Sequence, residues 1–280
     1  MIVFATATLS TMKVSFQSLN AKRGGLSAKD HIFFTMLVFL VATFPFLPYL
    51  FIASSMVWLY AAAYAICNVI FQIAYTCALS RGNVSLAVMF ANFGMLMPIA
   101  VSCVIYGDRP SPFRIVGICM IVIVFILNIK REKYRKPGYL ALVIVAMLAN
   151  GAGLSVQKLF VNFCNGDEIF EFVSASYLLG ALLCGIVCAI MSLDRNKKEY
   201  AFDWRTLLAS SGAGISLALF LALNTYAAGI VDGSFHYPTH SGAAILLSTL
   251  PGVLIFKDRL SSRQWFACVV GCVAIILMNF

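Results

Sequence analysis

Apolar residues form ten long runs along the chain, each separated from the next by a short polar or charged segment. The runs cover residues 2–20, 31–52, 56–79, 84–106, 115–129, 139–163, 168–192, 206–231, 234–256 and 264–280. Most have about the 17–25 residues that a helix needs to cross the hydrocarbon core of a bilayer. None shows the alternating pattern of a membrane-barrel strand. The pattern predicts an all-α integral membrane protein with ten transmembrane helices.

The composition agrees with a protein that is solvated mainly by lipid. Hydrophobic residues make up 61% of the chain, charged residues 11%, and the mean hydropathy is +0.92. A soluble protein carries about 25% charged residues. The net charge of +9 does not indicate nucleic acid as a partner, because the Lys and Arg residues lie in short loops between the apolar runs. The expected surroundings are the lipid bilayer of the cell (cytoplasmic) membrane, with no nucleic acid bound.

The cysteines are typical of packing side chains. Of the nine, only Cys164 lies in a loop between apolar runs. The pairs Cys184/Cys188 and Cys268/Cys272 share helix faces, but two thiolates do not complete a zinc site. Small apolar packing is the simpler interpretation. No metal site and no cofactor is therefore expected.

Basic residues are divided unequally between the two sets of loops. The loops after the odd-numbered runs hold sixteen of the 20 basic residues: Lys22, Arg23, Lys29, Arg81, Lys130, Arg131, Lys133, Arg135, Lys136, Arg195, Lys197, Lys198, Arg205, Lys257, Arg259 and Arg263. The other loops hold Arg109 and Arg114. Because positive loops favour the cytoplasm, the odd set is predicted to be cytoplasmic and both termini non-cytoplasmic. The first residues lack a basic region before the first run, so no cleavable signal peptide is expected.

Two similar charged segments each lie between two apolar runs. They are Asp108-Arg109-Pro110-Ser111 and Asp258-Arg259-Leu260-Ser261, 150 residues apart. Their spacing indicates two related halves, which in membrane proteins are typical of transporters. Each serine can cap the helix that follows, and each arginine can lie at the level of the headgroups.

Around these segments the chain resembles the drug/metabolite transporter superfamily, EamA type, over essentially its whole length. The resemblance is carried by residues 256–265, residues 106–111 with Gly117, and Tyr237-Pro238 with Gly242. It implies two inverted five-helix repeats at 1–130 and 139–280, joined by a basic linker loop at 131–138. Asp stands in both charged segments where Glu is commoner, and Ala267 stands where Gly is usual. The family model keeps both termini in the cytoplasm, whereas the loop charges here indicate the reverse.

Polar side chains within the apolar runs are the candidates for substrate binding, because they are costly in hydrocarbon and tend to face a cavity. Asn68, Gln72 and Tyr75 form one stripe of their predicted helix, and Asn150 and Gln157 share a face of another. The full predicted set is Asn68, Gln72, Tyr75, Asn92, Asn150, Gln157, Asn224 and His240. The alternative for each amide is a hydrogen bond between packed helices. Amides on four helices of both halves favour one central pocket.

Four further residues are candidates for coupling or gating: Lys13, Lys158, Glu171 and His236. Lys13 and Lys158 follow Ser10 and Ser155 at matching places in the two halves. They are predicted to lie near opposite membrane faces, either reaching to the interface or binding an anionic group alternately. Glu171, His236 and His240 are the titratable groups that could couple transport to protons.

The expected function is a secondary transporter, of the exporter type, that moves a small organic metabolite or drug-like solute by alternating access. A non-transporting membrane scaffold or assembly subunit is the alternative, and an intramembrane enzyme is a third. No enzyme is expected, because Ser10-x-x-Lys13 lacks its hydrolase companions and His236 and His240 lack the Glu of His-Glu-x-x-His. The expected partners are a small-molecule solute and lipid, with the protein a monomer or homodimer.

The division of basic residues predicts the orientation in the membrane. A reporter fused after Phe280 is expected to be non-cytoplasmic, and one inserted beside Lys133 to be cytoplasmic, because positive loops are retained inside. Enzymatic reporters active on one side only measure this directly. A cytoplasmic C-terminal reporter would show that the orientation follows the family model instead.

Overall fold

Helices make up nearly all of the described chain. The computed structural model describes residues 2–23, 26–82, 84–105, 107, 111–129, 138–164, 168–192, 200, 202–255 and 262–278. Its helices are α1 (Ile2–Ala21), α2 (Ala28–Thr43), η1 (Phe44–Ile52), α3 (Ser55–Leu79), α4 (Val84–Asn92), η2 (Phe93–Met95), α5 (Leu96–Ile105), α6 (Pro112–Ile129), α7 (Tyr139–Phe163), α8 (Ile169–Ser192), α9 (Trp204–Ile230), α10 (Gly233–Leu254) and α11 (Ser262–Met278). No strand occurs in this part of the chain. The all-α prediction is confirmed.

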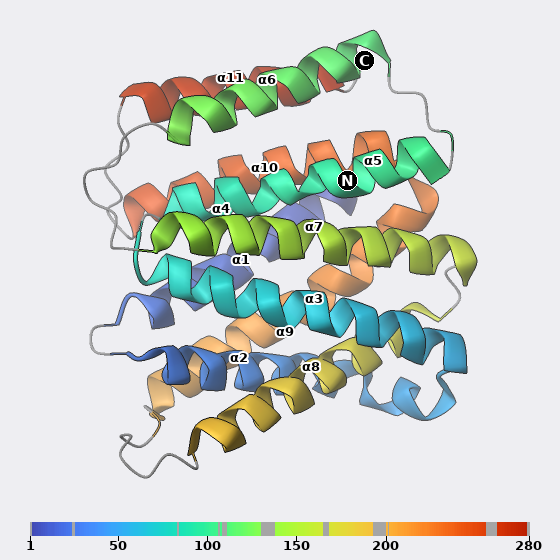
Figure 1. Ribbon diagram of the computed structural model, residues 1–280, viewed down its shortest axis with the longest axis vertical. Helices are drawn as coiled ribbons and strands as arrows, with labels where there is room; N and C mark the ends of the chain where they lie inside the picture. The colour runs from blue at the N-terminus through green and yellow to red at the C-terminus, as the bar shows by residue number, and fades with distance from the viewer. Residues whose placement is uncertain are drawn as a thin grey trace.

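Six segments within the described residues are long and apolar enough to cross a membrane. They are Ala28–Ile52, Ser55–Leu79, Ala87–Ile105, Tyr139–Phe163, Ile169–Ser192 and Trp204–Ile230. The length and composition of these helices are therefore those of a multi-pass membrane protein. In Figure 1 the helices run roughly side by side, and the connections lie at the two ends of this array. The junctions α1–α2 and α3–α4 lie at the left end, while α2–α3 and α7–α8 lie at the right.

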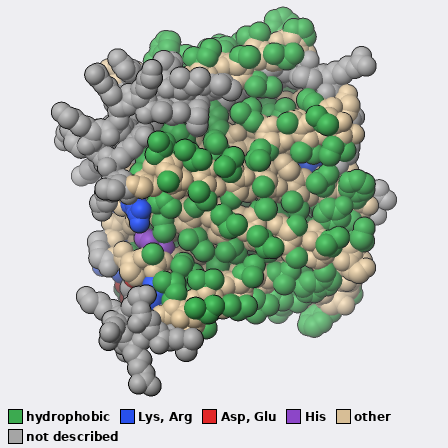
Figure 2. Space-filling view, viewed as in Figure 1, with side chains coloured by type: hydrophobic (Ala, Val, Ile, Leu, Met, Phe, Trp, Pro, Cys, Tyr) green, Lys and Arg blue, Asp and Glu red, His purple; other side chains and the backbone are tan. Residues whose placement is uncertain are grey.

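The outer surface is apolar. Large hydrophobic side chains are exposed on many helices, including Phe51 and Val104, each 85% exposed. Figure 2 shows hydrophobic side chains over most of one face, with Lys, Arg and His gathered mainly at its left edge. A soluble monomer rarely exposes so continuous an apolar area. The surface is suited to contact with lipid chains.

Local sequence explains where several helices begin. Ser27 and Asp30 form a capping box at the start of α2, with the Ser27 N–H donating to Asp30 Oδ2 at 2.7 Å. Ser54 caps α3 and Asp203 caps α9, each accepting from a backbone N–H of the first turn. Gly138 precedes α7 with φ of 81°, a conformation that side chains other than glycine rarely adopt.

Two of the predicted spans are interrupted helices. The run at 31–52 consists of α2 followed by the 3₁₀ segment η1, which contains Pro45 and Pro48. Each proline lacks the N–H that a continuing helix would use. The run at 84–106 consists of α4, the single 3₁₀ turn η2 at Gly94, and α5. By contrast, α10 continues through Pro238.

The helices pack in pairs drawn from distant parts of the chain. The most extensive contacts join α1 with α9, α3 with α7, and α2 with α8. Further contacts join α8 with α3, α2 with α9, and α10 with both α1 and α4. The pair α6 and α11 lies at the top of Figure 1, where α11 contacts α10. A space between α1, α9 and α10 on one side and α3, α4 and α7 on the other is thus surrounded by helices of both chain halves.

Most of the two charged segments lies outside the described residues. Asp108, Arg109 and Pro110 of the first, and all four residues of the second, are in that group, as is the basic cluster at 130–136. Ser111 directly precedes α6, and its carbonyl accepts a hydrogen bond from the Ile115 N–H at 3.1 Å. Ser111 therefore stands at the predicted helix start.

Polar contacts tie the starts of α3 and α9 to connections elsewhere in the chain. Arg23, just after α1, donates to both carboxylate oxygens of Asp203, at 2.8 and 2.5 Å, and to Thr206 Oγ1 at 2.9 Å. Glu168, just before α8, accepts from the Ser54 N–H at 3.0 Å and from its hydroxyl at 2.8 Å. Each contact thus joins an N-cap residue to the segment between two other helices.

The Arg23–Asp203 contact predicts a pH dependence of stability. Hydrogen bonds from Arg23, and then from Thr206, hold the pKa of the Asp203 carboxyl well below its usual range. A carboxyl whose pKa is lowered by folding stabilises the protein above its unfolded pKa of about 3.9, and this contribution is lost as the pH falls through the folded value. We expect Asp203→Asn to lower the unfolding temperature at pH 7, with a difference that shrinks below about pH 4.

Asparagine keeps the N-cap, since it caps helices about as well as aspartate. The comparison therefore isolates the charge pair and can be measured by thermal unfolding in detergent. Because both side chains are partly exposed, the effect is expected to be small and reduced by salt. A difference that stays constant from pH 7 to about pH 3 would contradict this account.

Candidate functional site

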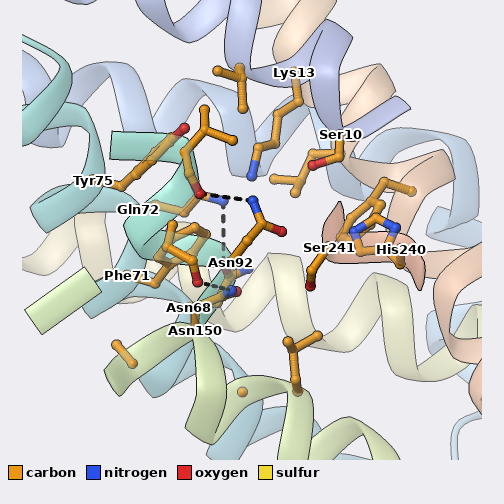
Figure 3. Close-up of a pocket in the computed structure, with 18 of the residues that line it drawn as sticks. Ser10, Lys13, Asn68, Phe71, Gln72, Tyr75, Asn92, Asn150, His240 and Ser241 are labelled. Carbon is orange, nitrogen blue, oxygen red and sulfur yellow. Dashed lines mark hydrogen bonds between the residues drawn. The ribbon is translucent and has the colours of Figure 1, made fainter. Parts of the chain in front are cut away.

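A cavity of about 50 Å³ lies in the space between α1, α3, α4, α7, α9 and α10. Its polar lining consists of Ser10, Lys13, Tyr64, Asn68, Gln72, Tyr75, Asn92, Asn150, His240 and Ser241. Lys13 is the lining residue with a full positive charge, and none of the lining residues is acidic. Figure 3 shows the labelled side chains among these entering the cavity from several helices. The predicted central pocket thus has a counterpart among the described residues.

The α3 wall carries the predicted polar stripe. Asn68, Gln72 and Tyr75 all line the cavity. Gln72 is fully buried; its Oε1 accepts from Gln17 Nε2 on α1 at 2.7 Å, and its Nε2 lies 3.4 Å from Asn68 Oδ1. Gln72 therefore combines both roles considered for it, since it lines the cavity and joins two helices. The Tyr75 hydroxyl is buried without a hydrogen-bond partner among the described residues.

Asn92 and Asn150 form the wall contributed by α4 and α7. Asn92 Nδ2 donates to the Val88 carbonyl at 2.8 Å, and Asn150 Nδ2 donates to the Ala91 carbonyl at 3.0 Å. Both bonds go to the backbone of α4 and appear as dashed lines in Figure 3. Using the amide nitrogen in this way leaves the amide oxygen as the group that can accept from a ligand.

Two glycines allow α7 to come close to the break between α4 and α5. A Cβ at Gly151 would lie 2.6 Å from the Gly94 carbonyl oxygen, and a Cβ at Gly94 would lie 2.6 Å from the Met147 carbonyl oxygen. Such distances are too short for any side chain against backbone. The close approach places Asn92 and Asn150 beside the same cavity.

Lys13 brings its charge into an aromatic part of the cavity. Its side chain is 5% exposed, and Nζ lies 5.1 Å from the ring centre of Phe71 and 5.8 Å from that of Tyr75. Both rings belong to α3, so this cation–π contact also joins α1 to α3. Within the described residues, no hydrogen bond or ion pair to Nζ accompanies it.

The hydrogen bonds of His240 determine which ring nitrogen carries hydrogen. His240 Nδ1 lies 3.0 Å from Thr6 Oγ1, and the Thr6 hydroxyl donates its hydrogen to the Val3 carbonyl at 2.8 Å. Thr6 must then accept from His240, so Nδ1 is protonated and Nε2 of the neutral ring is an acceptor. In Figure 3 the ring extends from α10 toward the cavity.

A second polar cluster lies outside the cavity lining and joins α7, α9 and α10. His236 Nε2 lies 3.1 Å from Asn224 Oδ1, and Asn224 Nδ2 donates to Gln157 Oε1 at 2.9 Å. Gln157 Nε2 donates to Thr225 Oγ1 at 2.7 Å, and that hydroxyl donates to the Leu221 carbonyl at 2.7 Å. These bonds form a continuous donor chain between three helices. The amides of Gln157 and Asn224 thus form interhelical hydrogen bonds, which was the alternative to substrate binding.

The remaining gating candidates are also buried. Lys158 is 7% exposed and donates from Nζ to the Ala228 carbonyl of α9 at 2.9 Å. Glu171 lies in the first turn of α8 and is 8% exposed. Neither residue lines the cavity, and neither does His236. Among the predicted gating residues, the structure brings only Lys13 to the cavity.

Several site residues were missed from the sequence. Ser10, Tyr64 and Ser241 line the cavity, and Gln17 and Thr225 complete the two interhelical contacts. A helical spacing of three residues from Lys13 could have indicated Ser10. Ser and Thr are too common in membrane helices for the others to be singled out.

Comparison with protein-family models found no match, and none was found among curated proteins. Solved structures do share the fold. One of them, described only as "Crystal structure of protein", has a TM-score of 0.67 and 15% sequence identity, covering 97% of this chain and 95% of that chain. At this identity the likeness establishes the fold alone.

The close approach of α7 predicts contrasting effects of two alanine substitutions. Gly151→Ala is expected to lower the unfolding temperature, because overpacking costs about 1–3 kcal/mol and exceeds the roughly 1 kcal/mol that Ala gains over Gly in a helix. Gly153→Ala is the matched control on the same helix. A Cβ there would meet its nearest side-chain atoms at 3.6 Å, so stability should be unchanged or raised. Equal effects of the two changes on thermal unfolding would contradict this view of α7.

Proposed function

We propose that the protein is a secondary transporter of a small organic solute that works by alternating access in the cell membrane. The proposal includes ten transmembrane helices in two inverted five-helix repeats of the drug/metabolite transporter type, operating as an exporter. The observation that carries it is the position of the cavity. A polar cavity lies between helices of both chain halves, and two interhelical polar contacts, α1 with α3 and α7 with α9, lie beside it.

The packing of the helices supports two related halves. In two related halves, α1 would correspond to α7, α2 to α8, α3 to α9, and the α4–α5 segment to α10. The contact of α1 with α9 then has its counterpart in the contact of α7 with α3. The contact of α2 with α9 likewise corresponds to that of α8 with α3. The two N-cap contacts correspond in the same way. Arg23, between α1 and α2, binds the N-cap of α9, and Glu168, between α7 and α8, binds the N-cap of α3. In Figure 1, α1 runs toward the left end and α7 toward the right, as inverted repeats require.

The two interhelical contacts, α1 with α3 and α7 with α9, are placed where two gates would be expected. The α1–α3 contact consists of Gln17 and Gln72, near the end of α1. The α7–α9 contact consists of Gln157, Asn224 and Thr225, in the last third of α7. Because α1 and α7 run in opposite directions, the two contacts lie toward opposite ends of the molecule.

The energy of these contacts suits gates that open and close. An interhelical hydrogen bond in a membrane protein contributes about 0.6 kcal/mol on average. Breaking one contact while keeping the other therefore costs on the order of 1 kcal/mol in hydrogen bonding. States open to either side can then be populated and shifted by a ligand. Both contacts are formed in this structure, and in the proposed cycle a state open to one side would lack one of them.

Accessibility of the cavity from each side tests this mechanism. Ser241→Cys places a thiol in the cavity lining, where a membrane-impermeant thiol reagent can report access from one side of a vesicle. Gln17→Ala weakens one gate and Gln157→Ala the other, and neither residue lines the cavity. Labelling of the same protein without Ser241→Cys corrects for its nine native cysteines.

We expect Gln17→Ala to raise labelling from the end where α1 terminates, and Gln157→Ala to raise it from the opposite end. Loss of the one bond of Gln17, about 0.6 kcal/mol, corresponds to roughly a threefold change in the open population, and loss of the two bonds of Gln157 to a larger change. An increase from the same end in both variants would indicate a one-sided pocket, and unchanged labelling would indicate a scaffold. Either result would overturn the proposal.

A further inference from the structure

Lys13 has no negative partner in the cavity that it lines. It is the lysine of the lining, and no Asp or Glu lies in the same lining. A buried ammonium without a counter-charge loses most of its favourable hydration. The rings of Phe71 and Tyr75, at 5.1 and 5.8 Å from Nζ, offset only part of that loss. The charge of the site is therefore unbalanced in the described protein.

Two serine hydroxyl groups line the same cavity as this ammonium. Ser10 lies one turn before Lys13 on α1, and Ser241 follows His240 on α10. In Figure 3 the Ser10 and Ser241 side chains and the Lys13 ammonium all enter the same space. Serine hydroxyls donate readily to carboxylate oxygens, and such bonds are strengthened by the charge. The cavity thus combines one positive charge with neutral donors.

The remaining walls limit the size and polarity of the ligand. Val14, Leu154, Leu217 and Phe220 form an apolar part of the lining. The cavity is small, with a volume of about 50 Å³, and partly open. A ligand bound here is expected to have few non-hydrogen atoms, with part of it apolar.

We infer that the cavity binds a small monocarboxylate, with its carboxylate beside Lys13 and its short aliphatic part against the apolar wall. The inference rests on the proposed transport function for its biological role, but not for the binding itself. An amino acid fits less well, because its ammonium would lie in a cavity that already holds Lys13 and offers no carboxylate. A dicarboxylate would bring a second charge that no lining cation matches.

Binding to the purified full-length protein in detergent tests this assignment. Propionate is the probe, compared with propionamide, propylamine, alanine and malonate at equal ionic strength, and binding is measured by calorimetry and by the shift in unfolding temperature. We expect propionate to bind at least tenfold more tightly than each of the other four. Equal binding of propionamide or alanine, or no binding of propionate, would overturn the inference without any variant being needed.

Substitution of lysines then locates the site. Lys13→Gln should weaken propionate binding at least tenfold, and Lys13→Arg should restore part of it. Lys158→Gln is the matched control, since Lys158 is a similarly buried lysine outside the cavity lining. It should leave the affinity within about twofold. Loss of binding in Lys158→Gln with retention in Lys13→Gln would place the anion elsewhere and overturn the assignment.

Flux measurements separate this inference from the proposed function. Propionate binding that depends on Lys13, without propionate movement across proteoliposomes, would support the site and contradict transport. Movement of an uncharged or cationic solute, without propionate binding, would support transport and contradict the monocarboxylate. Saturable propionate flux that Lys13→Gln abolishes would support both.

Discussion

The cost of an unsatisfied polar group in hydrocarbon governs this structure at every level. Backbone groups without water must bond within their own segment, which makes helices the only open-ended way to cross the bilayer. The same cost directs polar side chains inward. On α1, Phe4 and Leu19 are exposed, whereas Thr6, Lys13 and Gln17 are buried. The α1 helix, which is only moderately apolar overall, therefore has one apolar exposed face and one polar internal face.

Helix packing follows from the same constraint, because lipid provides no hydrophobic force between apolar helices. Close contact and interhelical hydrogen bonds have to supply the association instead. Gly94 and Gly151 supply the first by bringing two backbones together, and Gln157 with Asn224 and Thr225 supplies the second. Since each bond contributes modestly, the association of the helices depends on several such contacts together.

The two polar regions of the interior differ in how far their hydrogen bonds are used. In the cluster of Gln157, Asn224 and Thr225, donors and acceptors meet each other from helix to helix. In the cavity, Asn92 and Asn150 bind the backbone with their nitrogens, and the Lys13 ammonium contacts two aromatic rings without a hydrogen bond or ion pair to the described residues. The first region joins α7, α9 and α10, whereas in the second the Tyr75 hydroxyl has no hydrogen-bond partner among the described residues.

The sequence by itself determined the helical class, the approximate positions of the helices and a set of polar residues within them, because hydropathy and helix length are local properties. Only the tertiary structure decided which of these residues meet. Gln17 and Gln72 are 55 positions apart, and Gln157 and Asn224 are 67 apart. Asn150 and Gln157 share a face of α7, yet one lines the cavity and the other bonds to α9. The periodicity of a sequence predicts which residues share a face of a helix. The group that each of these residues contacts depends on which other helix packs beside it.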